Sequence, residues 1–197
     1  MNPNGGNVSK AVEDYEKVSV YDLSEERREA LLDEHVECSF AWTTRDGWPV
    51  SVIMSYLWHD GRFWLTAGAH RHRISAVRRD PRVCITITST GTSLGGGKSI
   101  TAKGRCVIHE DQETKDWFYP AFSAHLHKDP KTAKWFEGFL DSPLRVVLEV
   151  NVEKWITYDG EKMARDSVGK LSDDEKGAPK SSDSVRLQRE LERRKLV

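Results

Sequence analysis

The sequence has 197 residues, with 30 basic and 31 acidic side chains and a formal net charge of -1 at pH 7. This length suits one domain with a hydrophobic core plus terminal extensions, and the balanced charge excludes a global basic field that would attract nucleic acid or an anionic membrane. No apolar run approaches the roughly 20 residues of a membrane helix, and the polar start MNPNGGNVSK has no apolar secretory stretch, so we expect a cytoplasmic protein.

The distribution of apolar residues divides the chain into a folded domain and two polar ends. Apolar and aromatic side chains are frequent up to about residue 160, whereas charged side chains dominate the C-terminal part of the chain. The sequence therefore predicts a polar N-terminal arm at 1–20, a domain at 21–160 and a charged tail at 161–197. The tail includes SVRLQRELERRKLV, a pattern typical of a charged helix that is either solvated or packed on a second subunit.

The first part of the domain combines one helix with three antiparallel strands. Asp22 followed by Glu25 has the spacing of a capping box, which predicts a helix over 22–33. Residues rich in β-branched and aromatic types follow, and turn signals at Arg45-Asp46-Gly47 and Asp60-Gly61 separate them into runs. The predicted strands cover 36–44, 48–58 and 62–67.

The second part continues the strand pattern around a short helix. A helix fits residues 70–79 and stops at Asp80-Pro81, because the residue before a proline disfavours helical geometry. RVCITITS and SITAKGRCVIH are rich in strand-forming residues, and the flexible loop GTSLGGG lies between them. We therefore predict strands over 82–89 and 99–109.

Two helical pieces and the closing strands complete the domain. We expect Pro120 to interrupt the first piece within 111–140, and Asp129 as N-cap with Pro130 at the first helical position to open the second. An apolar stripe at helical spacing in this second piece indicates core or subunit contact: Trp135, Phe136, Phe139 and Leu140. Closing strands are predicted over 144–151 and 154–158, which gives a mainly β fold with flanking helices in a closed or half-closed antiparallel barrel.

Positive charge is concentrated where the helix at 70–79 begins. His70, Arg71, His72 and Arg73 lie at a helix N-terminus, where the helix dipole is already positive and unsatisfied N–H groups point outward. This arrangement is unfavourable without an anion. The preceding residues supply a hydroxyl and little side-chain bulk: Thr66, Ala67, Gly68 and Ala69. Because arginine forks match phosphate oxygens, the segment predicts a phosphate site; the alternative is that these basic side chains extend into water or pair with surface carboxylates.

Other chemistry-bearing patterns are weaker. GGGKS at 95–99 lacks the upstream glycine of a nucleotide-binding loop, although Lys98 and Ser99 could hold an anionic group across a subunit boundary. No catalytic nucleophile or carboxylate pair can be identified, and the histidines at 70, 72, 125 and 127 do not indicate a metal site. Three widely spaced cysteines are interpreted as buried thiols without a disulfide: Cys38, Cys84 and Cys106.

The order of these parts resembles the pyridoxamine 5'-phosphate oxidase-like, FMN-binding split-barrel family, which includes flavin and deazaflavin oxidoreductases. The resemblance covers about 35–160. Its signals are the opening helix, Gly47-Trp48-Pro49-Val50-Ser51-Val52 leading through Tyr56 to Asp60-Gly61, Leu65-Thr66, Arg73-Ile-Ser-Ala-Val-Arg-Arg-Asp-Pro-Arg-Val, and Gly104 in TAKGRCVIHED. It implies a six-stranded antiparallel split β-barrel with flanking helices.

The resemblance also implies a cofactor and its position. FMN would lie at a homodimer interface, with its phosphate near Thr66, Ala67, His72 and Arg73, or near Arg71 if the loop is shifted by one residue. The flavin ring would lie along the backbone of Ser51, Val52 and Ile53. Such a protein would transfer hydride to or from a small organic substrate, with a nicotinamide nucleotide as a candidate electron donor.

Two alternatives stay open from the sequence. Deazaflavin coenzyme F-420 could replace FMN on the same fold, its acidic tail using further basic groups such as Arg71 and Lys98. The chain could instead be a non-catalytic flavin or haem binding protein. Trp48 or Trp117 could form a substrate wall, and neither a nucleic acid nor a membrane partner is expected.

Overall fold

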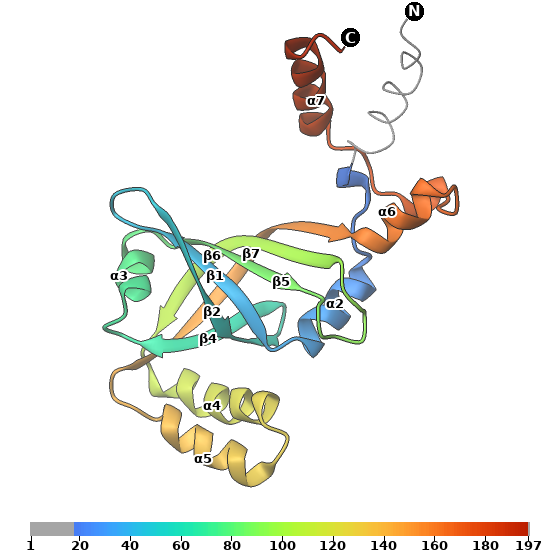
Figure 1. Ribbon diagram of the computed structural model, residues 1–197. Coiled ribbons are helices and arrows are strands. Elements are labelled where there is room, and N and C mark those ends of the chain that lie inside the picture. Colours follow the sequence, from blue (N-terminus) through green and yellow to red (C-terminus); the bar gives the residue numbers. More distant parts are fainter. Residues whose placement is uncertain (1–17, 197) are drawn as a thin grey trace, which may run out of the picture. The chain divides into compact units, whose positions relative to one another are not determined.

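The computed structural model describes residues 18–196, apart from the side chain of Ser181 (Figure 1). Two compact units make up the described chain. One comprises residues 25–156, and in the other residues 18–24 lie with residues 157–196. Of the predicted N-terminal arm, residues 1–17 lie outside the described part.

A single seven-stranded sheet forms the larger unit, with neighbours in the order β2-β1-β5-β6-β7-β4-β3. The strands are β1 Glu37–Thr43, β2 Pro49–Ser55, β3 Leu57–His59, β4 Arg62–Gly68, β5 Arg82–Thr88, β6 Lys98–His109 and β7 Arg145–Asp159. β1 pairs antiparallel with β2 and β5, β5 with β6, and β4 with β3 and β7. The predicted number of six strands is therefore wrong by one.

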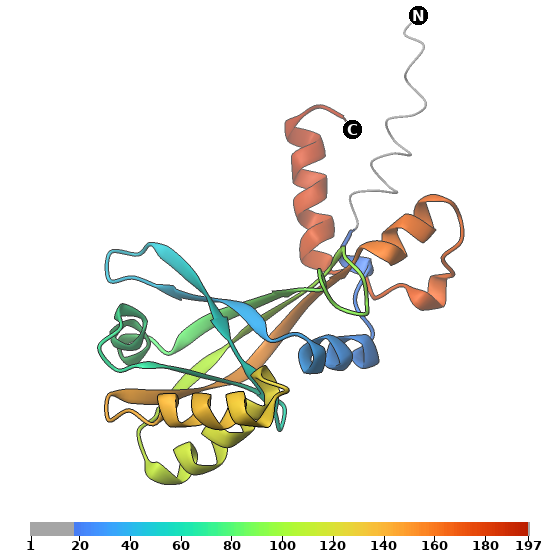
Figure 2. The same cartoon turned by 60° about the horizontal axis from the view of Figure 1, so that its bottom comes forward.

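Tyr56 divides the predicted strand 48–58 into β2 and β3. β2 and β3 lie at opposite ends of the sheet order, yet one residue separates them in the chain. The sheet must therefore curl until its two ends approach each other, which gives the half-barrel seen in Figures 1 and 2. Tyr56 is fully buried, and its hydroxyl donates to the Leu32 carbonyl at 3.0 Å. At the other end of the domain, the two predicted closing strands form the single strand β7.

The helices of this unit are α2 Glu25–Glu34, α3 His72–Arg79, α4 Gln112–Leu126 and α5 Pro130–Leu140. α2 begins three residues later than predicted, so Asp22 does not cap it; the Asp22 carboxylate instead accepts from the Thr157 hydroxyl at 3.4 Å. α4 continues through Pro120, contrary to the predicted interruption. α5 is capped as predicted, with the Asp129 carboxylate accepting from the Thr132 N–H at 2.9 Å.

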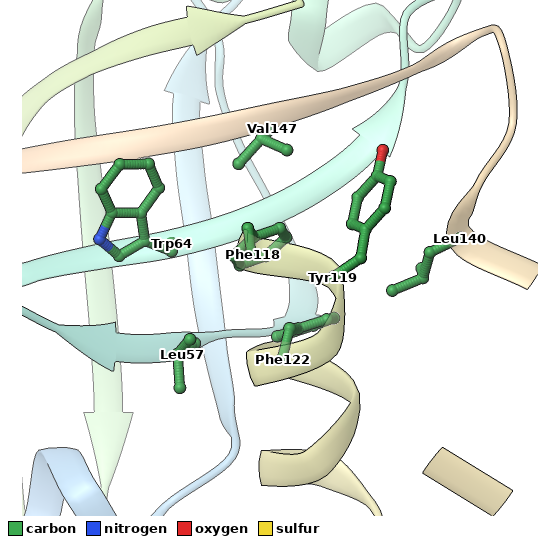
Figure 3. Packing of buried hydrophobic residues seen from close by; sticks show 7 residues of the cluster. All are labelled: Leu57, Trp64, Phe118, Tyr119, Phe122, Leu140 and Val147. Carbon is green, nitrogen blue, oxygen red and sulfur yellow. The ribbon is translucent and has the colours of Figure 1, made fainter. Parts of the chain in front are cut away.

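α4 and α5 lie side by side, and their apolar faces share a core with the sheet (Figures 2 and 3). The buried residues of this cluster come from β3, β4, β7, α4 and α5: Leu57, Trp64, Phe118, Tyr119, Phe122, Leu140 and Val147. Only part of the apolar stripe predicted on α5 is buried in this core. Leu140 is buried and Phe136 packs against the cluster, whereas Trp135 and Phe139 are 68% and 58% exposed.

The smaller unit contains η1 Val18–Val20, α6 Gly160–Ser167, η2 Asp173–Glu175 and α7 Ser181–Arg193. Val20, Tyr21 and Leu171 form its buried cluster, and the Tyr21 hydroxyl donates to the Asp166 carboxylate at 2.7 Å. α7 falls within the tail segment whose pattern indicated a charged helix. Between residues 18 and 196, no helix is both long enough and apolar enough to cross a membrane.

Candidate functional site

The predicted phosphate segment forms the connection from β4 to α3. At the end of β4, the Thr66 hydroxyl donates to the Val146 carbonyl at 2.8 Å, so its proton is engaged by the neighbouring strand β7. A Cβ built at Gly68 would lie 2.8 Å from an imidazole carbon of His70. The lack of a side chain at Gly68 therefore gives space to the His70 ring.

Arg71 occupies the N-cap position of α3 with extended backbone, and no side chain caps this helix end. The first turn of α3 contains no acidic residue, whereas Arg78 and Arg79 lie in the last turn. An uncapped helix start beside cationic side chains concentrates positive potential at one place. Within the described chain, neither Arg71 nor Arg45 has a hydrogen-bond or ion-pair partner for its side chain.

A basic cavity of about 590 Å³ opens beside this helix start. Strands β1 and β2, the turn between them and α3 provide its lining residues: Trp42, Thr44, Arg45, Val50, Val52, Arg71, His72, Arg73, Ser75, Ala76 and Arg79. Four arginines and one histidine thus line the cavity, and none of its lining residues is acidic. Arg79 also donates to the Thr43 carbonyl at 2.6 Å, which fixes it beside the cavity wall.

Arg73 is the most constrained cation of this group. Its Nε atom is buried and has no hydrogen-bond partner within the described chain. Burial lowers the pKa of its guanidinium from the ordinary value, and the neighbouring Arg71 charge adds to that shift. A buried donor without an acceptor is unfavourable, and an anion bound here would satisfy it.

A second cavity of about 230 Å³, which we call the aromatic cavity, adjoins the first through Arg73. It lies between strands β2 and β4 and the helices α4 and α5, with Arg145 at the start of β7. Its lining residues are Ile53, Met54, Ser55, Thr66, Arg73, Phe122, Leu126, Phe136, Phe139, Leu140 and Arg145. Arg73 is thus the residue that the two cavities share.

The predicted site residues on β2, β4 and α3 are distributed over both cavities and beyond them. Val52, Arg71, His72 and Arg73 line the basic cavity, while Ile53, Thr66 and Arg73 line the aromatic cavity. Ser51 is exposed on β2 and Ala67 is buried in β4, and neither residue lines the basic cavity or the aromatic cavity. The structure therefore brings most of this predicted set to the two cavities, with Arg73 between them.

Lys98 and Ser99 lie elsewhere in the chain. Ser99 pairs with Thr88 at the end of β5, whereas α3 leads into the beginning of β5 at Arg82. Lys98 is 4% exposed, and its ammonium group donates to the Leu94 carbonyl at 2.8 Å. One copy of the chain therefore does not bring these two residues to the basic cavity.

Sequence reasoning missed three arginines of this region. The sequence analysis uses Arg45 only as part of a turn signal and gives Arg79 no binding role, whereas both line the basic cavity. Arg145 was placed in a closing strand with no role, and it lines the aromatic cavity. The proposed substrate-wall tryptophans line neither cavity: Trp48 is 69% exposed and Trp117 packs edge-on against Trp64 at 4.7 Å.

In the part of the chain that the structure describes, no group of three or more histidine, cysteine or acidic side chains could hold a metal ion. The three cysteines are free, with Cys38 and Cys106 buried and Cys84 half-buried, so the expected burial is wrong in degree for Cys84.

Comparison with known proteins identifies the fold. Rv2991, a conserved hypothetical protein from Mycobacterium tuberculosis, is 19% identical, with 74% of this chain and 91% of that chain covered and a TM-score of 0.64. An FAD-binding protein from Mesorhizobium loti is 24% identical, with 68% and 94% covered and a TM-score of 0.53. General Stress Protein 26 from Bacillus anthracis is 17% identical, with 68% and 92% covered and a TM-score of 0.51.

No curated protein sequence matches the chain. The family profile of pyridoxamine 5'-phosphate oxidase, in contrast, matches residues 23–159, which is more than half of the chain. That match includes all seven strands, α3 and both cavities. The chain belongs to the pyridoxamine 5'-phosphate oxidase family.

Proposed function

We propose that this protein binds FMN and acts as a flavin-dependent oxidoreductase on a small organic substrate. The observation that carries the proposal is the buried, unpartnered Arg73 Nε in a cavity lined by three further arginines and no carboxylate. Membership of the family supports a flavin as the ligand that the arginines of the basic cavity bind. Arg71, His72 and Arg73 would hold the phosphate, with Arg45 from the β1–β2 turn and Arg79 from the last turn of α3 adding charge.

The cavity is suited to FMN in size as well as in charge. Its volume of about 590 Å³ lies within the range of roughly 300–1,000 Å³ typical of pockets for small ligands. The apolar side chains Trp42, Val50 and Val52 line the same cavity, so one ligand could place an anionic end against the arginines and an apolar part against β2. A free inorganic anion would not use this apolar wall.

β2 offers a second element of recognition through its backbone. It is a terminal strand in the sheet order and pairs with β1 along only one of its edges. The open edge of a terminal strand presents alternating N–H and C=O groups. The pyrimidine end of a flavin ring carries complementary acceptors and a donor, so the backbone of Ser51, Val52 and Ile53 would orient the ring.

The protein's contribution to the reaction would be binding and orientation. When bound, the flavin supplies the hydride-accepting and hydride-donating chemistry. Arg71 and Arg73 would fix the anionic end of the cofactor, β2 would fix the ring edge, and the apolar walls would limit access of water. No acidic or basic side chain of this chain is assigned to proton transfer.

The phosphate assignment is tested by comparing FMN with riboflavin, which lacks only the phosphate. Titrations of the flavin-free full chain would follow the quenching of flavin fluorescence. Because each charge-assisted hydrogen bond contributes about 1.5–3 kcal/mol, we expect riboflavin to bind roughly a hundredfold or more weakly than FMN. Equal affinities for FMN and riboflavin would refute a phosphate site in the basic cavity.

The oxidoreductase assignment needs a separate measurement. Under anaerobic conditions, a nicotinamide nucleotide should bleach the absorption of bound FMN, and a suitable acceptor should restore it. Bound FMN that is never reduced would instead indicate a carrier. Preferential binding of deazaflavin coenzyme F-420 over FMN in the same titration would replace the cofactor while keeping the fold.

A further inference from the structure

The polar contacts of α7, the last helix of the smaller unit (Figure 1), are local. Among the described residues, the hydrogen bonds and ion pairs of residues 182–196 join only residues of the segment 180–196. α7 has 13 residues, and an isolated helix shorter than roughly 12–15 residues is only marginally stable in water. Its polar contacts alone therefore do not account for a stable helix, and an apolar contact is needed.

Leu187 and Leu191 offer such a contact. They lie about one helical turn apart on the same side of α7, and both are partly exposed. Val185 lies on the opposite side of the helix and is 49% exposed. The two leucines form a narrow stripe, which we call the leucine stripe. It covers too little surface to hold two proteins together alone, so it suits a contact that adds to a larger interface.

Charged side chains alternate in sign along one flank of the leucine stripe. Asp183, Arg186, Glu190 and Arg194 follow one another at spacings of three or four residues, which places them in one row. From the start of the helix to its end, the row is negative, positive, negative and positive. Read in the reverse direction, it has the opposite sign at every position. The row is therefore complementary to a second copy of itself that runs the other way.

These four charges are accessible to a partner. Their side chains are between 31% and 67% exposed. In the single chain Arg186 pairs with Asp183, and Arg194 pairs with Glu190 at 2.6 Å. Exposed pairs along a helix contribute little to stability, so the same groups remain available for contacts with another helix.

We propose that α7 pairs antiparallel with α7 of a second copy of this chain, with Leu187 packed against the partner's Leu191. In an antiparallel pair related by a two-fold axis, equivalent flanks of the two helices lie on the same side, so the two charged rows meet. Asp183 then lies close to the level of the partner's Arg194, and Arg186 close to that of the partner's Glu190.

The opposite orientation satisfies fewer charges. A parallel pair would bring the charged row against the other flank of the partner helix, which carries Ser184, Gln188 and Lys195. Glu190 would then face the partner's Lys195, but Asp183 would face an uncharged residue. Because complementary charges select orientation more than they add affinity, the antiparallel pair is favoured.

Disulfide trapping in the full chain tests the pairing. Leu187→Cys and Leu191→Cys are introduced into two co-expressed copies that carry different affinity tags. Oxidised glutathione should link the two tags, because antiparallel pairing brings the new thiols within reach of a disulfide. Leu187→Cys alone should link to itself about tenfold more slowly, since the equivalent thiol lies one helical turn away. Non-reducing electrophoresis gives the rates, and mass spectrometry distinguishes these links from any made by the native cysteines of the larger unit.

Val185→Cys is the matched control, because it places an exposed thiol on the opposite side of the same helix. A second pair, Asp183→Cys with Arg194→Cys, keeps both leucines and should be joined by a short bismaleimide. Linking of Leu187→Cys to Leu191→Cys no faster than that of Val185→Cys to itself would overturn the pairing. Faster linking of Leu187→Cys to itself would overturn its antiparallel direction. None of these measurements involves a flavin, so the inference does not rest on the proposed function.

Discussion

At the scale of single residues, Arg73 links the two cavities. Its position in the sequence could be predicted, because a run of cations at a helix start is unfavourable without an anion. Arg45, Arg79 and Arg145 could not be found in that way. Each has an ordinary local explanation, and only the curl of the sheet and the path of α3 bring them to the cavities.

The first prediction at this scale concerns Arg71, which occupies the N-cap position of α3 and whose side chain makes no capping hydrogen bond. Arg71→Ala should weaken FMN binding about tenfold or more, because a charge-assisted contact to the phosphate is lost. Riboflavin binding should not change. Arg78→Ala is the matched control on the same helix, since Arg78 pairs with Glu110 and does not line the basic cavity. A similar loss in both variants, measured by fluorescence titration, would mean that only general charge matters.

The second prediction at this scale concerns the reactivity of the three cysteine thiols. Burial raises the pKa of Cys38 and Cys106 to about 12, whereas Cys84 is half-buried and its pKa is raised by partial burial. Since the thiolate is the reactive form, a pKa of about 12 leaves roughly one thiol in ten thousand ionised at pH 8. Iodoacetamide at pH 8 should therefore modify Cys84 first, and raising the pH should speed its reaction.

Mass spectrometry of tryptic peptides against time measures these rates. In concentrated urea all three cysteines should react at similar rates, because unfolding removes the burial that raises their pKa values. Modification of Cys38 or Cys106 in the folded protein as rapidly as Cys84 would contradict the buried positions of these two residues.

At the scale of elements, the alternation of apolar and polar residues and the turn signals predicted most of the strands. They did not predict where one strand ends its pairing with a first neighbour and begins pairing with another. β2 and β3 form one continuous pattern of apolar residues, because Tyr56 is itself buried and suits a strand. The break comes from tertiary pairing, with β1 on one side and β4 on the other, and no local signal encodes it. Likewise, the apolar face of α4 is continuous on both sides of Pro120, and its packing against the sheet outweighs the local cost of the proline.

That cost is measurable at Pro120. A proline in a helix interior cannot donate to the carbonyl four residues earlier, and its ring crowds that carbonyl. Pro120 is exposed, so Pro120→Ala should lose little packing. We expect the free energy of unfolding to rise by about 1–2 kcal/mol, the helix gain being reduced by the greater freedom of the unfolded chain. Urea unfolding followed by circular dichroism checks this value.

Pro130 provides the comparison, because it stands at the first position of α5, where its missing N–H would have no partner in any case. Pro130→Ala should leave stability unchanged or lower it by up to about 1 kcal/mol. Equal gains from both substitutions would contradict a cost of proline that depends on its position in the helix, because the greater freedom of the unfolded chain lowers stability in both variants. A loss of stability in Pro120→Ala would show that the proline ring is needed for packing.

At the scale of the whole molecule, the family match and the charge pattern concern the same larger unit, and this unit also exposes a group of large apolar side chains. Four large apolar side chains are 58–68% exposed there: Ile53, Trp135, Phe139 and Leu144. Trp135 and Phe139 stack at 5.9 Å, and Ile53 and Phe139 both line the aromatic cavity. Such grouping of apolar residues, next to the open edge of β2, is typical of a surface that another protein covers.

We predict that a second copy of the chain covers this surface. Sedimentation equilibrium should then give a mass of twice 22.5 kDa. Ile53→Asp should shift the protein toward the monomer, because it places a charge in an apolar interface. Val168→Asp is the control, since Val168 is equally exposed at 64% but belongs to the smaller unit. A monomeric wild type, or an Ile53→Asp variant that stays dimeric, would contradict this interface.

A monomeric variant also examines the role of Lys98 and Ser99, which one chain does not bring to the basic cavity. Trp135→Asp suits this test, because Trp135 is 68% exposed and lines neither cavity. If the partner subunit supplies Lys98 and Ser99 to the phosphate, monomeric Trp135→Asp should lose FMN affinity although the residues that line the basic cavity are unchanged. Ser99→Ala in the dimer should then weaken FMN but not riboflavin, because only FMN has the phosphate that the hydroxyl would contact. Unchanged FMN affinity in the monomer would show that one chain forms the whole phosphate site, from Arg71, His72 and Arg73.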